Sequence, residues 1–387
     1  MQLSTALFDR NNRAGGFGAG KGLPGGRSGK MLNEIKTLYL DVARLKVKLS
    51  TNYAKYYDYL RSYFEPVISS RDFTDDFDIE ANAFWQKGQE SSYLKELKRS
   101  GNFADVGANT LINEKKIVTI RKIEKKKKVI FDFKASERKL YLKAILRWKV
   151  FKDAIRYGIF GKSEEDWFFS VTFPVLYYPL FWYLEYFMQT HILHASGIEL
   201  NGRGLVVCGM EGIGKTSLVL SLLQEPGAHF LSDNLLFYDS QRIYPCYELV
   251  RIHKNEDDSL WRDKFRRVDK FRSLKGFFKP AFALKKEGVA PKIIIFPQFS
   301  QKFSVKAISG LEVVHKAAIM SQLPAELGNY GEFRKLYNFL DLNFNPQQSE
   351  YKALGALLNS CRCYTVGMPK ADGLKANVER LKDFLKE

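Results

Sequence analysis

The stretch "LVVCGMEGIGKTSLVLSLL" (residues 205–223) places a glycine-rich loop between two apolar runs. The first run is typical of a buried strand and the second of a buried helix. Gly209, Gly214, Lys215 and Thr216 fit the pattern G-x-x-x-x-G-K-[ST] without a gap. In such a loop the backbone N–H groups and the helix N-terminus face a phosphate chain. The stretch therefore predicts a nucleotide-binding loop between a strand and a helix.

Each residue type of this loop has an expected role. Lys215 is expected to reach the β- and γ-phosphates, and the Thr216 hydroxyl is expected to ligate Mg²⁺. The chain contains no guanine-selecting N-K-x-D motif, so ATP and Mg²⁺ are the predicted cofactors. The predicted nucleotide-binding residues are Gly209, Met210, Glu211, Gly212, Ile213, Gly214, Lys215, Thr216 and Ser217.

An acidic residue follows the loop at a suitable separation. Asp233 in "HFLSDN" lies 18 residues after Lys215, the length of one short helix and a return strand. We expect that strand to lie beside the strand that enters the loop, so that Asp233 binds Mg²⁺ or accepts a proton from an attacking hydroxyl. Capping of a turn is the alternative role of Asp233. Asp239, at the end of "LLFYD", is a second candidate, whereas "KIIIFPQF" (292–299) ends without an acid.

These segments resemble a known family. "HASGIELNGRGLVVCGMEGIGKTSLVLSLL" (194–223) followed by "HFLSDN" (229–234) is similar to the ATP-binding domain of the HPr kinase/phosphorylase group. Phosphoenolpyruvate carboxykinase is a structural cousin of that group. The resemblance covers residues 190–255 well and the rest of the chain only in general layout. It implies an α/β fold, with a P-loop HPr-kinase/PEP-carboxykinase-like C-terminal domain preceded by an α+β N-terminal lobe.

The resemblance also implies an activity and a set of site residues. The activity is transfer of the γ-phosphoryl group of ATP to a hydroxyl of a protein, a peptide or a small molecule. The implied catalytic residues are Asp233, His194 and Arg251, and the implied metal ligands are Thr216 and Asp233. Arg251, in "YPCYELVRI" (244–252), would neutralise charge on the transferred group. A core role for His194 and a surface salt bridge for Arg251 are the alternatives.

The chain departs from the family at two places. The acid pair of the family reads Asp233-Asn234 here, and the "LEIRGLG"-like signature is absent. The HPr protein is therefore not carried over as the phosphoryl acceptor. Glu248 is a further candidate for the Mg²⁺ shell. A regulatory module that binds ATP without transferring phosphate is the first alternative function, because Asn234 replaces a carboxylate.

Two basic stretches lead to the second alternative, a nucleic-acid-dependent ATPase. They are residues 115–134 and 260–286, and the second interleaves aromatic residues with Arg and Lys. Such interleaving is found in base-stacking proteins and in elements that bury aromatics while their charges stay solvated. The stretch 260–286 could also form a basic lid over the site or a docking surface for an acidic protein or peptide. The interleaved aromatic residues are Trp261, Phe265, Phe271, Phe277 and Phe278.

The composition of the chain bears on its partners and its location in the cell. The chain has 387 residues and a formal charge of +18, which favours anionic partners. Four cysteines without a C-x-x-C pair suggest a reducing, cytoplasmic location. Cys361 and Cys363 are expected to be buried thiols rather than zinc ligands. The aromatic run 171–193 contains two prolines and Glu185, so we expect a buried helix rather than a membrane span. HPr kinases form oligomers, so the resemblance also implies a homo-oligomer.

The expected organisation has three parts: a Gly-rich tail (1–30), an α+β lobe (31–165) and an ATP-binding domain (166–387). Within the lobe we expect strands over 38–49 and a helix over 53–64 whose N-cap is Asn52. A hairpin over 117–133 and a helix over 138–157 follow. The turn Asn201-Gly202 should join two strands ahead of the loop. The chain should end with a strand and then a helix.

Overall fold

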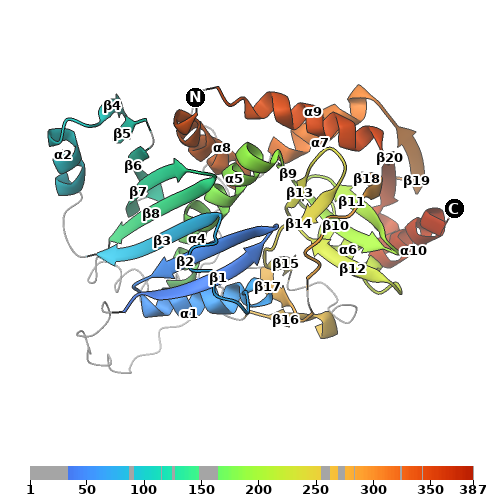
Figure 1. The fold of residues 1–387 in the computed structure, drawn as a ribbon. Coiled ribbons are helices and arrows are strands. Elements are labelled where there is room, and N and C mark those ends of the chain that lie inside the picture. Colours follow the sequence, from blue (N-terminus) through green and yellow to red (C-terminus); the bar gives the residue numbers. More distant parts are fainter. Residues whose placement is uncertain are drawn as a thin grey trace, which may run out of the picture.

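Two large β-sheets with helices packed on their faces form the structure, a computed structural model (Figure 1). Two three-stranded sheets accompany them. The predicted α/β class is therefore confirmed. The structure describes residues 34–86, 91–114, 116–123, 127–147, 164–253, 262–268, 275–282, 284–322, 325–341 and 343–386.

The first half of the chain builds an eight-stranded sheet. Its strands, in spatial order, are β1 (Lys36–Val42), β2 (Leu45–Thr51), β3 (Ile79–Gln86), β8 (Lys139–Arg147), β7 (Lys127–Ser136), β6 (Lys116–Ile123), β5 (Thr110–Asn113) and β4 (Ala104–Gly107). The β2–β3 and β3–β8 pairs are parallel and the other pairs are antiparallel. The predicted strands over 38–49 are confirmed as β1 and β2, and the predicted hairpin over 117–133 is confirmed as β6 and β7.

One face of this sheet is covered by helices. They are α1 (Ala54–Tyr63) and a continuous helical run made of α4 (Glu164–Thr172), the π-helical turn η2 (Phe173–Tyr177) and α5 (Tyr178–Met188). Almost every side chain from Val171 to Glu185 is buried, which confirms the expected buried helix. No helix in the described part of the chain is long and apolar enough to cross a membrane.

The second half of the chain builds a six-stranded sheet, the one that carries the glycine loop. Its strands, in spatial order, are β12 (Ala228–Ser232), β10 (Ala195–Leu200), β11 (Arg203–Cys208), β18 (Pro291–Ser300), β20 (Arg362–Pro369) and β19 (Ser304–Ile308). The predicted turn is confirmed, since Asn201 and Gly202 both have positive φ and join β10 to β11. The β11–β18 and β18–β20 pairs are parallel.

Helices cover both faces of the six-stranded sheet. The helices α6 (Lys215–Leu222) and α10 (Gly373–Lys386) share an apolar core with one face. On the other face lie α7 (Leu311–Gln322) and α9 (Pro346–Asn359). The predicted helix after the loop and the predicted strand and helix at the end of the chain are thereby confirmed.

Two small sheets and several helices and turns complete the described part of the chain. One small sheet is β14 (Ile243–Pro245), β13 (Leu236–Tyr238) and β9 (His191–Leu193), and the other is β15 (Val250–His253), β17 (Lys275–Pro280) and β16 (Phe265–Arg267). The remaining elements are η1 (Glu65–Val67), α2 (Ser91–Arg99), η3 (Arg262–Lys264), α8 (Ala325–Tyr337), η4 (Asn338–Leu340) and η5 (Lys370–Asp372).

The basic aromatic stretch 260–286 contains strands. Phe277 and Phe278 are neighbours on β17 and pack into two different cores, one on each face of the strand. Phe265 is buried on β16. Burial on two faces therefore accounts for the interleaved aromatics that the structure describes. Trp261 and Phe271 lie outside the described residues.

Two expectations about local structure are wrong. The helix expected over 138–157 is strand β8 as far as Arg147, and the rest of that range lies outside the described residues. Leu140, Leu142, Ala144 and Leu146 are buried at every second position, the period of a strand.

Asn52 does not cap α1, whose N-cap residue is Tyr53. The Asn52 side chain instead accepts a hydrogen bond from the Trp85 N–H (2.8 Å) and donates one to the Trp85 carbonyl (3.0 Å). Because Asn52 satisfies both backbone groups of a β3 residue, it ties the end of β2 to β3 rather than starting a helix.

The two halves of the chain share one apolar core. The Tyr177 hydroxyl donates to the Tyr247 carbonyl (2.6 Å), and the Tyr247 hydroxyl donates to the Tyr63 carbonyl (2.6 Å). The core cluster around them contains residues of the eight-stranded sheet, of the helical run and of the segment 235–249. The division of the chain near residue 165 remains a prediction.

Candidate functional site

The glycine loop lies at the carboxyl edge of the six-stranded sheet. It leaves β11 after Cys208 and enters α6 at Lys215. Gly212 and Gly214 have φ values of 81° and 89°, a region that residues with side chains rarely adopt. The carboxyl ends of β18 and β20 meet the same edge because both strands run in the direction of β11. In open α/β sheets this edge is where ligands bind.

Lys215 is buried against the loop. Only 8% of the residue is exposed, and its Nζ donates to the carbonyls of Gly209 (2.7 Å) and Met210 (3.1 Å). A buried ammonium group needs such partners because leaving water is costly for a charge. The loop carbonyls therefore hold a positive charge inside the curve of the loop.

Asp233 lies near the loop, but its strand has a different neighbour from the expected one. Its strand, β12, pairs with β10, and β10 separates it from β11. The expectation that β12 lies beside β11 is wrong because the β10–β11 hairpin places β10 in that position. Asp233 nevertheless follows the carboxyl end of β12 at the same edge, where its carboxylate lies close enough to the Thr216 side chain for that side chain to lower its pKa.

Several groups fix the Asp233 carboxylate. The Ser196 hydroxyl of β10 hydrogen-bonds the Asp233 main-chain carbonyl and lies 3.3 Å from Oδ1. The backbone N–H of Arg251 points at Oδ2 from 3.5 Å. Burial raises the pKa of Asp233 above its ordinary value, although the Thr216 side chain, the Arg251 backbone N–H and the charges of Lys215 and Arg251 oppose the rise. The result is a positioned carboxylate that takes up a proton more readily than an exposed aspartate.

The Arg251 side chain is half-buried rather than at the surface. It begins on β15, and its guanidinium carbon lies 5.6 Å from the centre of the Phe169 ring. Its charge lies close enough to lower the pKa of Asp233. Arg251 thus adds positive charge on the side of Asp233 that faces the first half of the chain.

Asn234 and Glu248 form a pair beside Asp233. The Asn234 amide donates to Glu248 Oε2 over 2.9 Å, and Glu248 is buried. An amide can donate this bond and an ionised carboxylate cannot. A second acid at position 234 would instead face the Glu248 carboxylate. The geometry therefore gives a physical reason for Asn234 at this position.

His194 lies where the glycine loop begins, since the next residue, Ala195, pairs with Cys208. The His194 residue is buried, and its Nδ1 lies 3.2 Å from the Met320 carbonyl of α7. This contact fits the core alternative for the ring, while the backbone position is at the edge of the site.

The sequence interpretation missed Ser196. It is completely buried on β10, and its hydroxyl contacts two oxygens of Asp233. The only available signal was a small polar residue within the apolar run "ASGIEL" (195–200).

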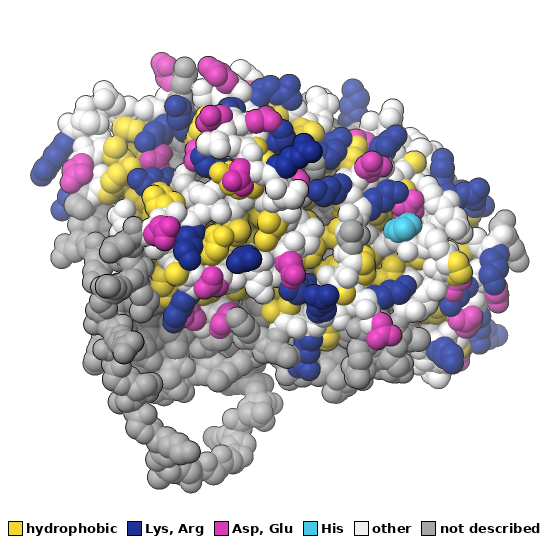
Figure 2. All heavy atoms as spheres, turned by 60° about the horizontal axis from the view of Figure 1, so that its bottom comes forward, with side chains coloured by type: hydrophobic (Ala, Val, Ile, Leu, Met, Phe, Trp, Pro, Cys, Tyr) yellow, Lys and Arg dark blue, Asp and Glu magenta, His cyan; other side chains and the backbone are white. Residues whose placement is uncertain are grey.

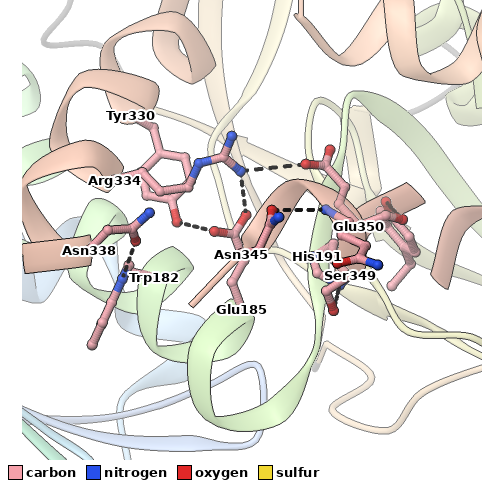
Figure 3. Close-up of polar contacts among 11 residues, drawn as sticks. Trp182, Glu185, His191, Tyr330, Arg334, Asn338, Asn345, Ser349 and Glu350 are labelled. Carbon is pink, nitrogen blue, oxygen red and sulfur yellow. Dashed lines mark hydrogen bonds and ion pairs between the residues drawn. The ribbon is translucent and has the colours of Figure 1, made fainter. Parts of the chain in front are cut away.

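A second buried polar cluster joins α5, α8, α9 and β9 (Figure 3). Glu185 accepts a hydrogen bond from the Tyr330 hydroxyl (2.6 Å) and pairs with Arg334 (3.3 Å), which also reaches Glu350 (3.5 Å). Burial raises the pKa of Glu185 to about 7. Burial and the Arg334 charge lower the pKa of His191 to about 4. The sequence suggested none of these pairs, because they join segments up to 149 residues apart.

The cysteines lie mostly in the interior. Cys363 is buried, which confirms the expectation for this residue, and Cys208 is buried too; burial raises the pKa of each to about 12. Cys361, which was also expected to be buried, is only half-buried, and its Sγ lies 3.1 Å from the Leu357 carbonyl.

Comparison with known proteins identifies no family for this chain. No protein-family model matches the chain, and no curated protein matches it at a significant level.

Proposed function

We propose that the chain is an ATP-dependent kinase that transfers the γ-phosphoryl group to a hydroxyl, with a P-loop core of the HPr-kinase type in residues 166–387. One observation carries the proposal: the buried Asp233 carboxylate lies close to the Thr216 side chain, which directly follows Lys215 in the glycine loop and lowers the pKa of that carboxylate. This juxtaposition unites three groups that phosphoryl transfer uses, namely a cation for phosphate, oxygen ligands for Mg²⁺ and a proton acceptor.

The residues present fit both ATP and Mg²⁺. The Lys215 ammonium rests on carbonyls of the loop itself, so phosphate oxygens can take the place of these acceptors without a large movement. The positive φ of Gly212 and Gly214 suits a loop whose N–H groups converge on an anion. Thr216 and Asp233 offer the oxygen ligands that Mg²⁺ prefers. Bound Mg²⁺ would neutralise charge on the β- and γ-phosphates.

Residues of the chain accept the proton and neutralise charge during the transfer. Asp233 accepts the proton of the attacking hydroxyl, and Ser196 and the Arg251 backbone N–H hold it in place. Lys215 and the Arg251 side chain supply positive charge beside the transferred group. The acceptor is a hydroxyl compound, and the net charge of +18 favours an acidic protein or peptide. The proposed setting is the cytoplasm, where ATP and reduced thiols occur together.

Transfer of labelled γ-phosphate from ATP to a lysate of the source cells tests the proposal. We expect the wild type to label an acceptor and Asp233→Asn to lower the rate about 10²- to 10⁴-fold, the usual contribution of a positioned general base. Asp239→Asn is the matched control, because Asp239 follows the next strand along the chain and its carboxylate accepts hydrogen bonds from nearby groups, namely the N–H groups of Gln241 and Arg242 and the Tyr244 hydroxyl. Equal labelling by the wild type and Asp233→Asn would contradict the proposed role of Asp233.

A regulatory module that binds ATP without transfer is the second candidate. The observation that favours it is the Asn234–Glu248 pair, which leaves one carboxylate fewer beside Asp233 than an acid pair would give. This candidate predicts that the wild type binds Mg-ATP but labels no acceptor, and that Asp233→Asn binds ATP equally well.

A further inference from the structure

An exposed aromatic ring lies beside the glycine loop, on the side away from Asp233. Phe299 is 48% exposed near the end of β18. The strand β18 pairs directly with β11, whereas β12, which leads to Asp233, lies two strands away on the other side of β11. The loop is therefore flanked by Asp233 on one side and by Phe299 on the other.

The register of β18 places Phe299 close to the loop. Val207 pairs with Ile295, and a side-chain carbon added to Gly209 would lie 3.5 Å from Cγ of Pro297. Phe299 follows Pro297 by two residues, about 7 Å further along the strand and on the same face. Ring and loop thus share the α6–α10 face of the sheet, at the edge where the loop opens.

Two residues lie next to this ring, one on the adjacent strand and one in the turn that follows it. Phe299 pairs in register with Met368, a buried residue of β20, and the Lys370 Nζ lies 4.0 Å from the centre of the Phe299 ring. Lys370 belongs to η5, the turn that leads from β20 into α10. The helix α10 lies beside α6 (Figure 1), so Lys370 immediately precedes a helix that neighbours the loop helix.

We propose that Phe299 and Lys370 form the subsite for the base of the bound nucleotide, an inference that rests on the proposed binding of ATP at the loop. A nucleobase offers a flat π-face, which stacks on an exposed aromatic ring, and ring nitrogens, which accept a hydrogen bond from an ammonium group. A triphosphate held by the loop, with its terminal phosphate at Asp233, directs its base to the opposite side, where Phe299 lies. The subsite would give preference for a nucleotide over the bare phosphate chain.

Calorimetric titration with Mg-ATP and with Mg-tripolyphosphate, which has the phosphates but no base, tests this proposal. Base–aromatic stacking predicts that Phe299→Ala weakens ATP about 5- to 150-fold and leaves tripolyphosphate unchanged. Tyr351→Ala is the matched control, because Tyr351 is 49% exposed on α9, which packs on the opposite face of the sheet. Lys215→Ala should weaken both ligands.

A second variant guards against a folding defect. Phe299→Trp should keep ATP affinity, and the added indole should lose fluorescence when ATP binds but not when tripolyphosphate binds. The subsite is wrong if Phe299→Ala binds ATP as the wild type does, or loses both ligands equally. Binding of neither ligand to the wild type would overturn the proposed function together with the subsite.

Discussion

At the scale of single residues, the structure buries several charges and gives each of them partners. Lys215 is held by loop carbonyls, Asp233 by Ser196 and the Arg251 backbone N–H, and Glu185 by Tyr330 and Arg334. Burial of an ionisable group without such partners is costly. The two carboxylates differ in place: Asp233 lies at the edge of a sheet beside an exposed loop, whereas Glu185 lies among packed helices.

The raised pKa of Glu185 makes stability depend on pH. Because this pKa rises from 4.5 to about 7 on folding, the folded protein keeps a proton that the unfolded chain releases between these values. The stabilisation from Glu185 is therefore complete below pH 4.5 and is lost as the pH rises through about 7. We expect the free energy of unfolding of the wild type to fall, relative to Glu185→Gln, by on the order of 3 kcal/mol across this range.

Urea denaturation of both proteins at several pH values checks this expectation. His191 has the opposite linkage, since its lowered pKa favours the folded state above pH 6.5 and weakens it as the pH falls through about 4. This contribution is present in both proteins and cancels in the difference. Parallel pH profiles for the wild type and Glu185→Gln would show that Glu185 is already ionised in the folded protein.

At the scale of elements, α8 connects the helical run of the first half to α9 of the second. Arg334 of α8 pairs with Glu185 of α5 and with Glu350 of α9 (Figure 3). Removing one partner of a buried pair leaves the other charges without compensation. One side chain therefore contributes to the packing of three helices.

Substitution of Arg334 should be costly for this reason. We expect Arg334→Met to lower the free energy of unfolding by about 3 kcal/mol or more. The neighbouring Lys335 forms an exposed pair with Glu332, so Lys335→Ala should change stability by less than about 0.5 kcal/mol. Chemical denaturation at pH 8 compares the two variants, and equal small effects would mean that the buried cluster stabilises little.

Elements with local signals could be predicted from the sequence. The β10–β11 hairpin combines alternating apolar residues with the turn Asn201-Gly202, and both signals lie within 14 residues. The β8 segment was misread because leucines and alanines also suit helices, and only pairing with β3 and β7 selects the strand.

The candidate site could be predicted only where it is continuous in sequence. The loop and Thr216 follow from one motif, and Asp233 follows from its separation from that motif. The Ser196–Asp233 contact and the Asn234–Glu248 pair depend on which strands are neighbours. Strand order is a property of the assembled sheet, so the sequence carried no local signal for these contacts.

At the scale of the whole molecule, both halves of the chain contribute to one core. Tyr247, from the second half, bonds the Tyr63 carbonyl of the first half inside that core. On the face shown in Figure 2, Lys and Arg side chains alternate with Asp and Glu rather than forming one basic field. The halves are thus joined by packing and hydrogen bonds in the interior.

This shared core predicts cooperative unfolding. We expect fluorescence and circular dichroism to report a single transition in urea, and Tyr247→Phe to move both signals together by about 1–2 kcal/mol. Tyr351→Phe, at an exposed position, should move neither by more than about 0.5 kcal/mol. Two separate transitions, only one of which shifts in Tyr247→Phe, would show that the halves fold independently.

The central claim is that the glycine loop holds a nucleoside triphosphate through Lys215. Thermal unfolding with and without Mg-ATP tests it most directly, with wild type and Lys215→Ala compared at one protein concentration. The account predicts that ATP at about 100 times its dissociation constant stabilises the wild type by about 2.7 kcal/mol and leaves Lys215→Ala nearly unchanged. An unchanged melting temperature of the wild type at millimolar Mg-ATP, or an equal rise in both proteins, would contradict the account.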